Sequence, residues 1–179
     1  MEAKVVTIIP EKAIHVPQRE ALLDRAFGPK RRRKTSERLR EGRMPSRSLA
    51  FAAINRSGRL IGTVRLWDIE AGTAGKALLL GPIAIDARHR GRGLGSALMR
   101  HAIAAAKAEG ARAILLVGDA PFYSRFGFSK LEGLALPGPV DPDRFLGLEI
   151  EPGALASATG LVAAAGLPEL EKPELRFGT

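Results

Sequence analysis

Two segments of the sequence combine residue types that can do chemistry. The first is the glycine-rich run Arg90-Gly91-Arg92-Gly93-Leu94-Gly95-Ser96, and the second contains Tyr123, the only tyrosine of the chain. Glycines let a backbone approach a ligand closely, and the first turn of a helix offers amide groups without intrahelical partners. If the run opens a helix, its amides and the positive end of the helix dipole form a pyrophosphate site. Arg90 and Arg92 would add charge-assisted hydrogen bonds to phosphate oxygens, or Arg90 would turn inward and hold the loop.

A glycine-rich turn from strand to helix has other interpretations. A P-loop needs Gly-Lys-Ser or Gly-Lys-Thr, and no lysine follows these glycines. A dinucleotide fold needs G-x-G-x-x-G/A near its start, whereas here Ser96 or Leu98 takes the last position and antiparallel strands are expected before the loop. A tight connection that binds no ligand is the third interpretation.

The elements on both sides of the loop must position it. Residues 78–85 form an apolar run typical of a strand, and Gly81-Pro82 within it predicts a bulge because proline cannot donate to the ladder. Residues 93–110 carry apolar side chains at helical spacing, and residues 113–117 have the composition of a short buried strand. A strand, a helix and a strand in this order predict a right-handed crossover and a parallel pair.

The rest of the chain predicts a largely antiparallel sheet. Two β-rich runs joined by Asn55-Arg56-Ser57-Gly58 are typical of a hairpin that leads into the strand at 78–85. The other expected elements are helices at 17–27, 37–41 and 121–125 and strands at 4–9, 48–54, 60–69, 131–136 and 144–150. We therefore expect one α/β (α+β) domain over residues 1–155, with a tail over 156–179 that packs or extends on the same domain.

These motifs resemble the GNAT superfamily of acetyl-CoA-dependent N-acetyltransferases. Four further segments resemble a bacterial subgroup of predicted N-acetyltransferases: Leu80-Gly81-Pro82, Val117-Gly118-Asp119 and residues 136–140 and 148–153. Arg90, Gly93 and Gly95 fit the family pattern Gln/Arg-x-x-Gly-x-Gly/Ala. The run from Gly81 to Asp86 resembles the fourth strand of the family, and the run from Tyr123 to Phe128 resembles its Tyr-x-x-x-Gly-Phe segment. The resemblance implies a central mixed sheet of about six or seven strands with an antiparallel N-terminal meander and about four flanking helices. It also implies that the fourth and fifth strands are parallel and splayed.

The resemblance also assigns roles to individual residues. In this family the backbone of the splayed strand pairs with the pantetheine arm of acetyl-CoA, which maps onto Ile83, Ala84 and Ile85. The loop amides from Gly91 to Ser96 would bind the pyrophosphate, and an amide such as that of Ile83 would hold the oxyanion. By the same analogy Tyr123 is the general acid that protonates the departing thiolate, which suits a side chain with an ordinary pKa near 10. The alternative is a core tyrosine with a satisfied hydroxyl.

The sequence departs from the family pattern at two points. Many members carry a glutamate general base on the fourth strand, and residues 77–85 contain no glutamate. Many also carry an asparagine several residues before the tyrosine, and here none lies between Asp119 and Tyr123. The base is left open between water and four carboxylates, of which Asp86 and Asp119 are also expected to cap a loop or a helix: Asp68, Glu70, Asp86 and Asp119.

Positive charge is concentrated in one segment. Residues 30–47 contain nine Lys or Arg and two Glu, in a chain whose formal net charge is +9. Such a run suits a solvated face or a nucleic-acid footprint. The family resemblance implies that this part of the chain borders the acceptor site, where it would favour an acidic acceptor or an acidic surface of a protein substrate. No aromatic residue interleaves with it, so base stacking is not expected. The alternative function is a nucleic-acid-binding module on a GNAT-like scaffold. Trp67, on the hairpin, would line the acceptor site or lie in the core.

Composition narrows the cofactors and partners. The chain has no cysteine, which excludes disulfides, thiolate metal sites and a cysteine nucleophile. Its three histidines are scattered in sequence, so we expect no metal. No apolar run is long enough to span a membrane and the N-terminus lacks a secretory pattern, so we expect a cytoplasmic protein without a membrane partner. The family resemblance implies acetyl-CoA as co-substrate and a small-molecule, peptide or protein amine as acceptor. Nucleic acid is not the favoured partner, and a homodimer is left open.

Overall fold

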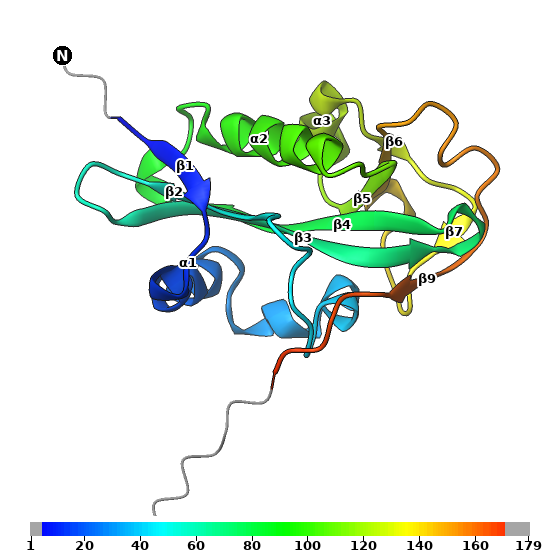
Figure 1. Cartoon of the computed structure of the whole chain (residues 1–179), viewed down its shortest axis with the longest axis horizontal. Coiled ribbons are helices and arrows are strands. Elements are labelled where there is room, and N and C mark those ends of the chain that lie inside the picture. Colours follow the sequence, from blue (N-terminus) through cyan, green and yellow to red (C-terminus); the bar gives the residue numbers. More distant parts are fainter. Residues whose placement is uncertain (1–4, 171–179) are drawn as a thin grey trace, which may run out of the picture.

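A nine-stranded sheet runs through the middle of the molecule, with helices on both faces (Figure 1). The computed structural model describes residues 5–170. One face carries α1 (Val16–Phe27) and two short 3-10 helices, η2 (Pro29–Arg33) and η3 (Thr35–Leu39). The other face carries α2 (Leu94–Ala108) and α3 (Ala120–Tyr123). Within the described range, no helix is long and apolar enough to cross a membrane.

The strands combine an antiparallel meander with one parallel pair in the main order. That order is β1 (Thr7–Pro10), β2 (Ala50–Ile54), β3 (Leu60–Ala71), β4 (Lys76–Ile85), β5 (Ala113–Val117), β8 (Phe145–Glu149) and β6 (Ser129–Lys130). Outside it, β9 (Gly160–Ala164) pairs with the end of β3 and with β7 (Leu134–Ala135). The pair β4 and β5 is parallel because the chain crosses between them through α2. The mixed sheet confirms the predicted fold class.

Alternate residues of β4 pack into two different cores. Leu78 and Leu80 belong to the cluster under α2, together with Leu98 and Met99, whereas Leu79 belongs to the cluster on the opposite face. All five side chains are buried. The alternation follows from the two-residue period of a strand, and full burial of such a side chain contributes about 1.5–3 kcal/mol. Burial on both faces therefore fixes β4 in the centre of the sheet.

The bulge predicted at Gly81-Pro82 is present in β4. Val64 of β3 pairs with Ile83, and Leu66 pairs with Leu80. Over this interval β4 contributes one residue more than β3, so the extra residue lies at the glycine and proline. The bulge bends β4 at the point where it leaves β5.

The parallel pairing of β4 with β5 is short. It is formed at Leu78 and Leu79, which pair with Ile114 and Leu115. From residue 80 onward β4 keeps β3 as its partner on one edge, and its other edge has no partner strand in the described structure. The two strands therefore splay.

Several short elements differ from the prediction. The helix expected at 37–41 is the 3-10 helix η3, and the strand expected at 131–136 is replaced by β6 and β7. β9 lies in the predicted tail, where no element was expected. The three strands β6, β7 and β9 form through pairing with other segments of the chain, which local periodicity does not report. Lys4, the first residue of the strand expected at 4–9, and residues 171–179 of the tail lie outside the described residues.

Candidate active site

The separation of β4 from β5 opens a groove made of two cavities. The charged cavity, of about 670 Å³, lies between the ends of β4 and β5 and the segment of η2 and η3. The loop cavity, of about 570 Å³, follows β4 to the start of α2. Phe27, Ile83, Phe122 and Tyr123 line both cavities. A ligand that extends from one cavity into the other must therefore pass Tyr123.

The glycine-rich loop forms one end of the loop cavity. Gly91 and Gly93 have φ angles of +76° and +78°, a left-handed backbone that glycine adopts without strain. Four consecutive amides, from Gly93 to Ser96, have no hydrogen-bond acceptor within residues 5–170. They open a helix of 15 residues, whose dipole adds positive potential. These residues fit a pyrophosphate, which needs several donors at one place.

The two arginines of the loop differ in position. Arg90 is exposed and lines the loop cavity, whereas Arg92 is exposed and does not line it. In the described part of the chain neither guanidinium forms an ion pair or a hydrogen bond. Arg90 therefore does not hold the loop from inside, and its charge faces the cavity.

The free edge of β4 forms one wall of the loop cavity. Ile83, Ala84 and Ile85 line it, all beyond the bulge. Unpaired peptide groups on a strand edge can bind an extended chain that carries amides, as an added strand would. This wall leads from the glycine-rich loop towards Tyr123.

Tyr123 is half-buried where the two cavities meet. Its ring packs edge-to-face against Phe122 and Phe128, with centroid distances of 4.9 and 6.1 Å. No hydrogen bond to its hydroxyl is formed by any residue between 5 and 170. Burial raises the pKa of Tyr123; the positive charge of Arg144 lowers it, and the carboxylate of Asp119 raises it. The phenol is therefore protonated at neutral pH and can donate to a ligand.

Gly118, which sequence reasoning missed, sets the position of the tyrosine ring. It follows β5 directly, and a Cβ at this position would lie 2.2 Å from Tyr123 Cε2. Real carbon atoms do not approach so closely, so any side chain here would displace the ring. The only signal in the sequence is a glycine at the end of a buried strand, which does not reveal what it contacts.

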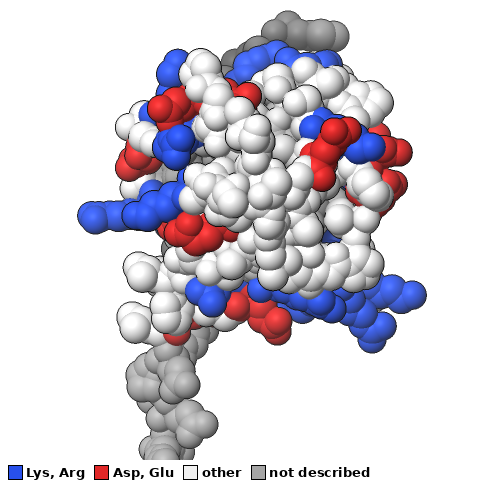
Figure 2. Space-filling model, turned by 90° about the vertical axis from the view of Figure 1, so that its right-hand side faces the viewer, with Lys and Arg blue, Asp and Glu red and all other residues white. Residues whose placement is uncertain are grey.

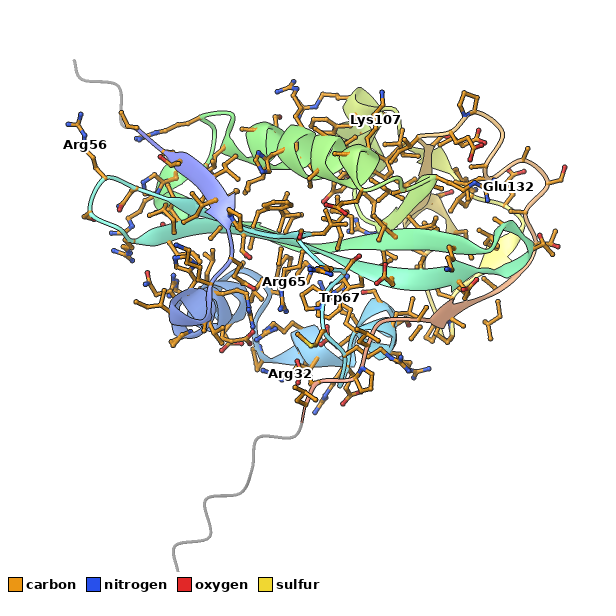
Figure 3. The ribbon with its side chains drawn as sticks, viewed as in Figure 1. Arg32, Arg56, Arg65, Trp67, Lys107 and Glu132 are labelled. Atoms are coloured by element: carbon orange, nitrogen blue, oxygen red, sulfur yellow. The ribbon has the colours of Figure 1, made fainter. Side chains whose placement is uncertain are left out.

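Trp67 lies in the core and anchors the bulge. It is 4% exposed, and its indole Nε1 donates to the Gly81 carbonyl at 2.6 Å. Figure 3 shows Trp67 and Arg65 on the face of the sheet that carries α1, and the Arg65 guanidinium carbon lies 4.8 Å from the ring centroid. Of the two interpretations of Trp67, the core position is confirmed. The buried indole holds the carbonyl that precedes Pro82.

Three of the four carboxylates considered as bases lie away from Tyr123. Asp68 and Glu70 line neither cavity, and Asp68 accepts a hydrogen bond from the Ser46 hydroxyl. Asp86 accepts from the side chain and the backbone amide of Arg88, which lower its pKa to about 2. Such a weak base cannot accept a proton efficiently near neutral pH.

Asp119 lies in the right place for a base. It lines the charged cavity together with Tyr123, and its charge acts on the phenol. It occupies the N-cap position of α3, but its side chain makes no cap hydrogen bond, so the carboxylate is available. Glu37, which the sequence did not single out, lines the same cavity.

The basic segment 30–47 folds over the charged cavity, and much of it is fixed to the protein. Figure 2 shows Lys and Arg side chains gathered along the lower part of the molecule, on the side where Figure 1 places η2 and η3. Arg31 donates to Asp24 at 2.8 Å, and Arg38 donates to the Pro137 carbonyl. The segment is therefore partly a structural wall of the groove rather than a uniformly free basic surface.

Histidines contribute little to the groove. His89 lines the loop cavity, with its Nδ1 3.9 Å from Asp86, whereas His15 and His101 lie elsewhere. Within the described residues, no group of three or more His, Asp or Glu is placed to hold a metal ion.

Comparison with known proteins decides the family. The model of the "Acetyltransferase (GNAT) family" matches residues 17–128, which include the splayed strand, the glycine-rich loop and Tyr123. The chain belongs to the GNAT family. It is an N-acetyltransferase by class, and the resemblance noted in the sequence is confirmed.

One similar GNAT protein supports this assignment, and a second solved structure shows the same fold. The uncharacterized N-acetyltransferase YhbS of Escherichia coli strain K12 is 30% identical over 155 residues, which cover 85% of this chain and 92% of the relative. The crystal structure of YhbS from Escherichia coli in complex with CoA has a TM-score of 0.76 at 28% identity and covers 92% of both chains. A GNAT family acetyltransferase from Brucella melitensis in complex with acetyl-CoA has the same fold, with a TM-score of 0.67 at 24% identity over 91% of this chain and 97% of that one.

Proposed function

We propose that this protein transfers the acetyl group of acetyl-CoA directly to a primary amine. The observation that carries the proposal is the position of Tyr123, which lines both the cavity that ends at unpartnered helix amides and the cavity that faces the charged segment. Acetyl-CoA occupies the loop cavity, with its pyrophosphate on the amides of Gly93 to Ser96 and its pantetheine arm along residues 83–85. The amine enters through the charged cavity. The CoA complex of the similar YhbS supports this choice of co-substrate.

The reaction needs an acid at the sulfur atom. The amine nitrogen attacks the thioester carbonyl carbon, the bond between that carbon and sulfur breaks, and the thiolate takes up a proton. Tyr123 donates this proton, since its raised pKa keeps the phenol protonated. An amide of the splayed strand, such as that of Ile83, stabilises the oxyanion of the attacked carbonyl.

The amine must also lose a proton. We assign this step to Asp119, acting directly or through water, because its carboxylate lies in the charged cavity and is not engaged in capping α3. In this proposal the amine loses its proton and the sulfur gains one in the same part of the groove, where Asp119 and Tyr123 line the charged cavity.

The test is thermal unfolding of the protein with acetyl-CoA and, separately, with DNA and RNA over a range of salt concentrations. A ligand that binds the folded state raises the unfolding midpoint, and the rise grows with the logarithm of the ratio of its concentration to its Kd. We expect stabilisation by acetyl-CoA and no steep salt-dependent binding of nucleic acid. Stabilisation by nucleic acid alone would instead support a binding module on this scaffold.

A further inference from the structure

In the described part of the molecule, five cations line the charged cavity: Arg31, Arg33 and three that act on one another electrostatically. Lys34 lies between η2 and η3, Arg40 follows η3, and Arg144 precedes β8; all three line the cavity that Tyr123 also lines. We call them the cationic cluster. The three charges are close enough to affect one another. Burial lowers the pKa of Lys34 most, and the positive charges of Arg40 and Arg144 lower it further.

Among the described residues, the one carboxylate paired with the cationic cluster is that of Glu37, beside Arg40. In the part of the chain that the structure describes, no ion pair involves Lys34 or Arg144. The Arg40 side chain is only 11% exposed, its Nε has no hydrogen-bond partner, and its nearest carboxylate is Glu37, with 3.6 Å between Nη1 and Oε2. Burial lowers the pKa of Arg40 to about 10. A buried donor without a partner is costly, which favours an anionic ligand beside it.

The other carboxylates of the cavity form no ion pair with Lys34 or Arg144 in the described structure. Arg31 also lines the cavity but is already paired with acidic residues of α1. The cavity carries three carboxylates, Glu37, Asp119 and Asp141. The Asp141 carboxylate accepts a hydrogen bond from the backbone amide of Asp143, and the negative charge of Asp119 raises the pKa of Tyr123. The Lys34 Nζ lies 4.5 Å from the centroid of the Phe27 ring, and neither Lys34 nor Arg144 has a carboxylate partner among residues 5–170.

The cluster lies within reach of the proposed reaction centre. A Cβ on Gly81 would lie 2.8 Å from Arg40 Nη2, which places the guanidinium against the bulge of β4. Arg144 lies close enough to Tyr123 for its charge to act on the phenol. One molecule can therefore contact the cationic cluster at one end and reach Tyr123 at the other.

We propose that the cationic cluster binds an oxyanion of the acceptor, so that the acceptor is a small amine that also carries a carboxylate or a phosphate. This inference rests on the proposed acetyl transfer and names the class of its acceptor. The oxyanion binds to Lys34, Arg40 and Arg144, and the amine reaches the acetyl carbonyl beside Tyr123. Arginine suits this role because its planar donors match a carboxylate or phosphate.

The experiment measures kcat/KM for matched pairs of acceptors. One arm compares ω-amino acids of increasing length with their carboxamides, and the other compares aminoalkyl phosphates with the corresponding amino alcohols. We expect the anionic member of a pair to be preferred by roughly 10- to 100-fold, the range of one charge-assisted hydrogen bond. The arm with the stronger preference identifies the oxyanion.

Substitutions then locate the preference. Arg144→Gln and Lys34→Met change exposed side chains, so these variants are expected to fold, whereas Arg40→Gln alters a nearly buried one. Each should raise KM for the anionic acceptor by a larger factor than KM for its uncharged partner, so that the ratio of the two kcat/KM values falls. Arg47→Gln is the matched control, since Arg47 is exposed in the same basic segment and does not line the cavity.

The outcomes separate the two proposals. Equal kcat/KM for charged and uncharged acceptors, or equal losses in Arg144→Gln and Arg47→Gln, would overturn the anionic acceptor while leaving acetyl transfer intact. Absence of turnover with both members of every pair would count against acetyl transfer to small amines and against this inference together. The anionic-acceptor proposal is supported if the wild type prefers the anionic acceptor, Arg144→Gln loses this preference and Arg47→Gln keeps it.

Discussion

At the scale of single residues, the proposed chemistry depends on one phenol. Tyr123 is the only tyrosine of the chain, so its ionisation can be followed by ultraviolet absorbance without interference from another tyrosine. Because burial disfavours the phenolate, we expect a midpoint above the ordinary value near 10. Arg144→Gln should raise the midpoint further, since it removes a positive charge that stabilises the phenolate. A midpoint at or below the ordinary value would contradict the described burial.

The contact between Gly118 and Tyr123 gives a second prediction. In Gly118→Ala the new Cβ displaces the ring, and we expect kcat to fall by roughly 10-fold or more, as it does when a catalytic group is misplaced by about 1 Å. The control is the same substitution in the Tyr123→Phe background. If Gly118 acts through the hydroxyl, the two losses are not additive. Additive losses would show that Gly118 supports some other part of the site.

At the scale of elements, the start of α2 is predicted to bind the pyrophosphate. Gly93→Glu places a side chain and a negative charge beside the unpartnered amides. The protein has room for this side chain, because a Cβ at Gly93 meets no atom within 4 Å. We expect acetyl-CoA binding, measured by calorimetry, to weaken by roughly 100-fold, which equals the loss of two charge-assisted hydrogen bonds of about 1.5 kcal/mol each.

Gly110→Glu is the matched control for this change. Gly110 follows α2 at its other end, has a similar φ of +82° and is exposed, with equally open space at its Cβ. It therefore carries the same backbone strain and charge without touching the loop. Equal affinities of the two variants for acetyl-CoA would mean that the loop is not the pyrophosphate site.

The bulge of β4 is stabilised by a hydrogen bond from the Trp67 indole to the Gly81 carbonyl. Trp67→Phe removes the donor to the Gly81 carbonyl while keeping an aromatic side chain in the core. We expect the free energy of unfolding in urea to fall by about 1–3 kcal/mol, the cost of leaving a buried carbonyl unsatisfied. An unchanged free energy of unfolding would show that water or another donor replaces the indole.

Local sequence patterns predicted the elements that form the cofactor side of the groove. The proline in an apolar run predicted the bulge, and the glycines before a helical period predicted the turn into α2. The same patterns did not predict β9, whose pairing with β3 joins residues that lie far apart in sequence. They also did not reveal that Gly118 contacts Tyr123, since packing between side chain and backbone depends on the three-dimensional path of the chain.

At the scale of the whole molecule, the charged cavity could not be predicted from sequence. Lys34 and Arg40 lie about a hundred positions before Arg144, and only the folded sheet brings them together. The sequence showed that segment 30–47 is positively charged. It did not show which of its side chains form ion pairs or hydrogen bonds with the rest of the protein. The sequence therefore predicted the loop cavity of the groove, whereas the charged cavity depends on how the whole chain folds.

The measurement that tests the central claim most directly is release of free thiol from acetyl-CoA with a panel of primary amines, for the wild-type protein and Tyr123→Phe. We predict acceptor-dependent thiol release by the wild type. We also predict a kcat reduced by roughly 100-fold or more in the variant, as expected for loss of a general acid, with unchanged affinity for acetyl-CoA. Equal kcat in the two proteins would contradict the role of Tyr123, and no thiol release with any amine would contradict the proposed acetyl transfer.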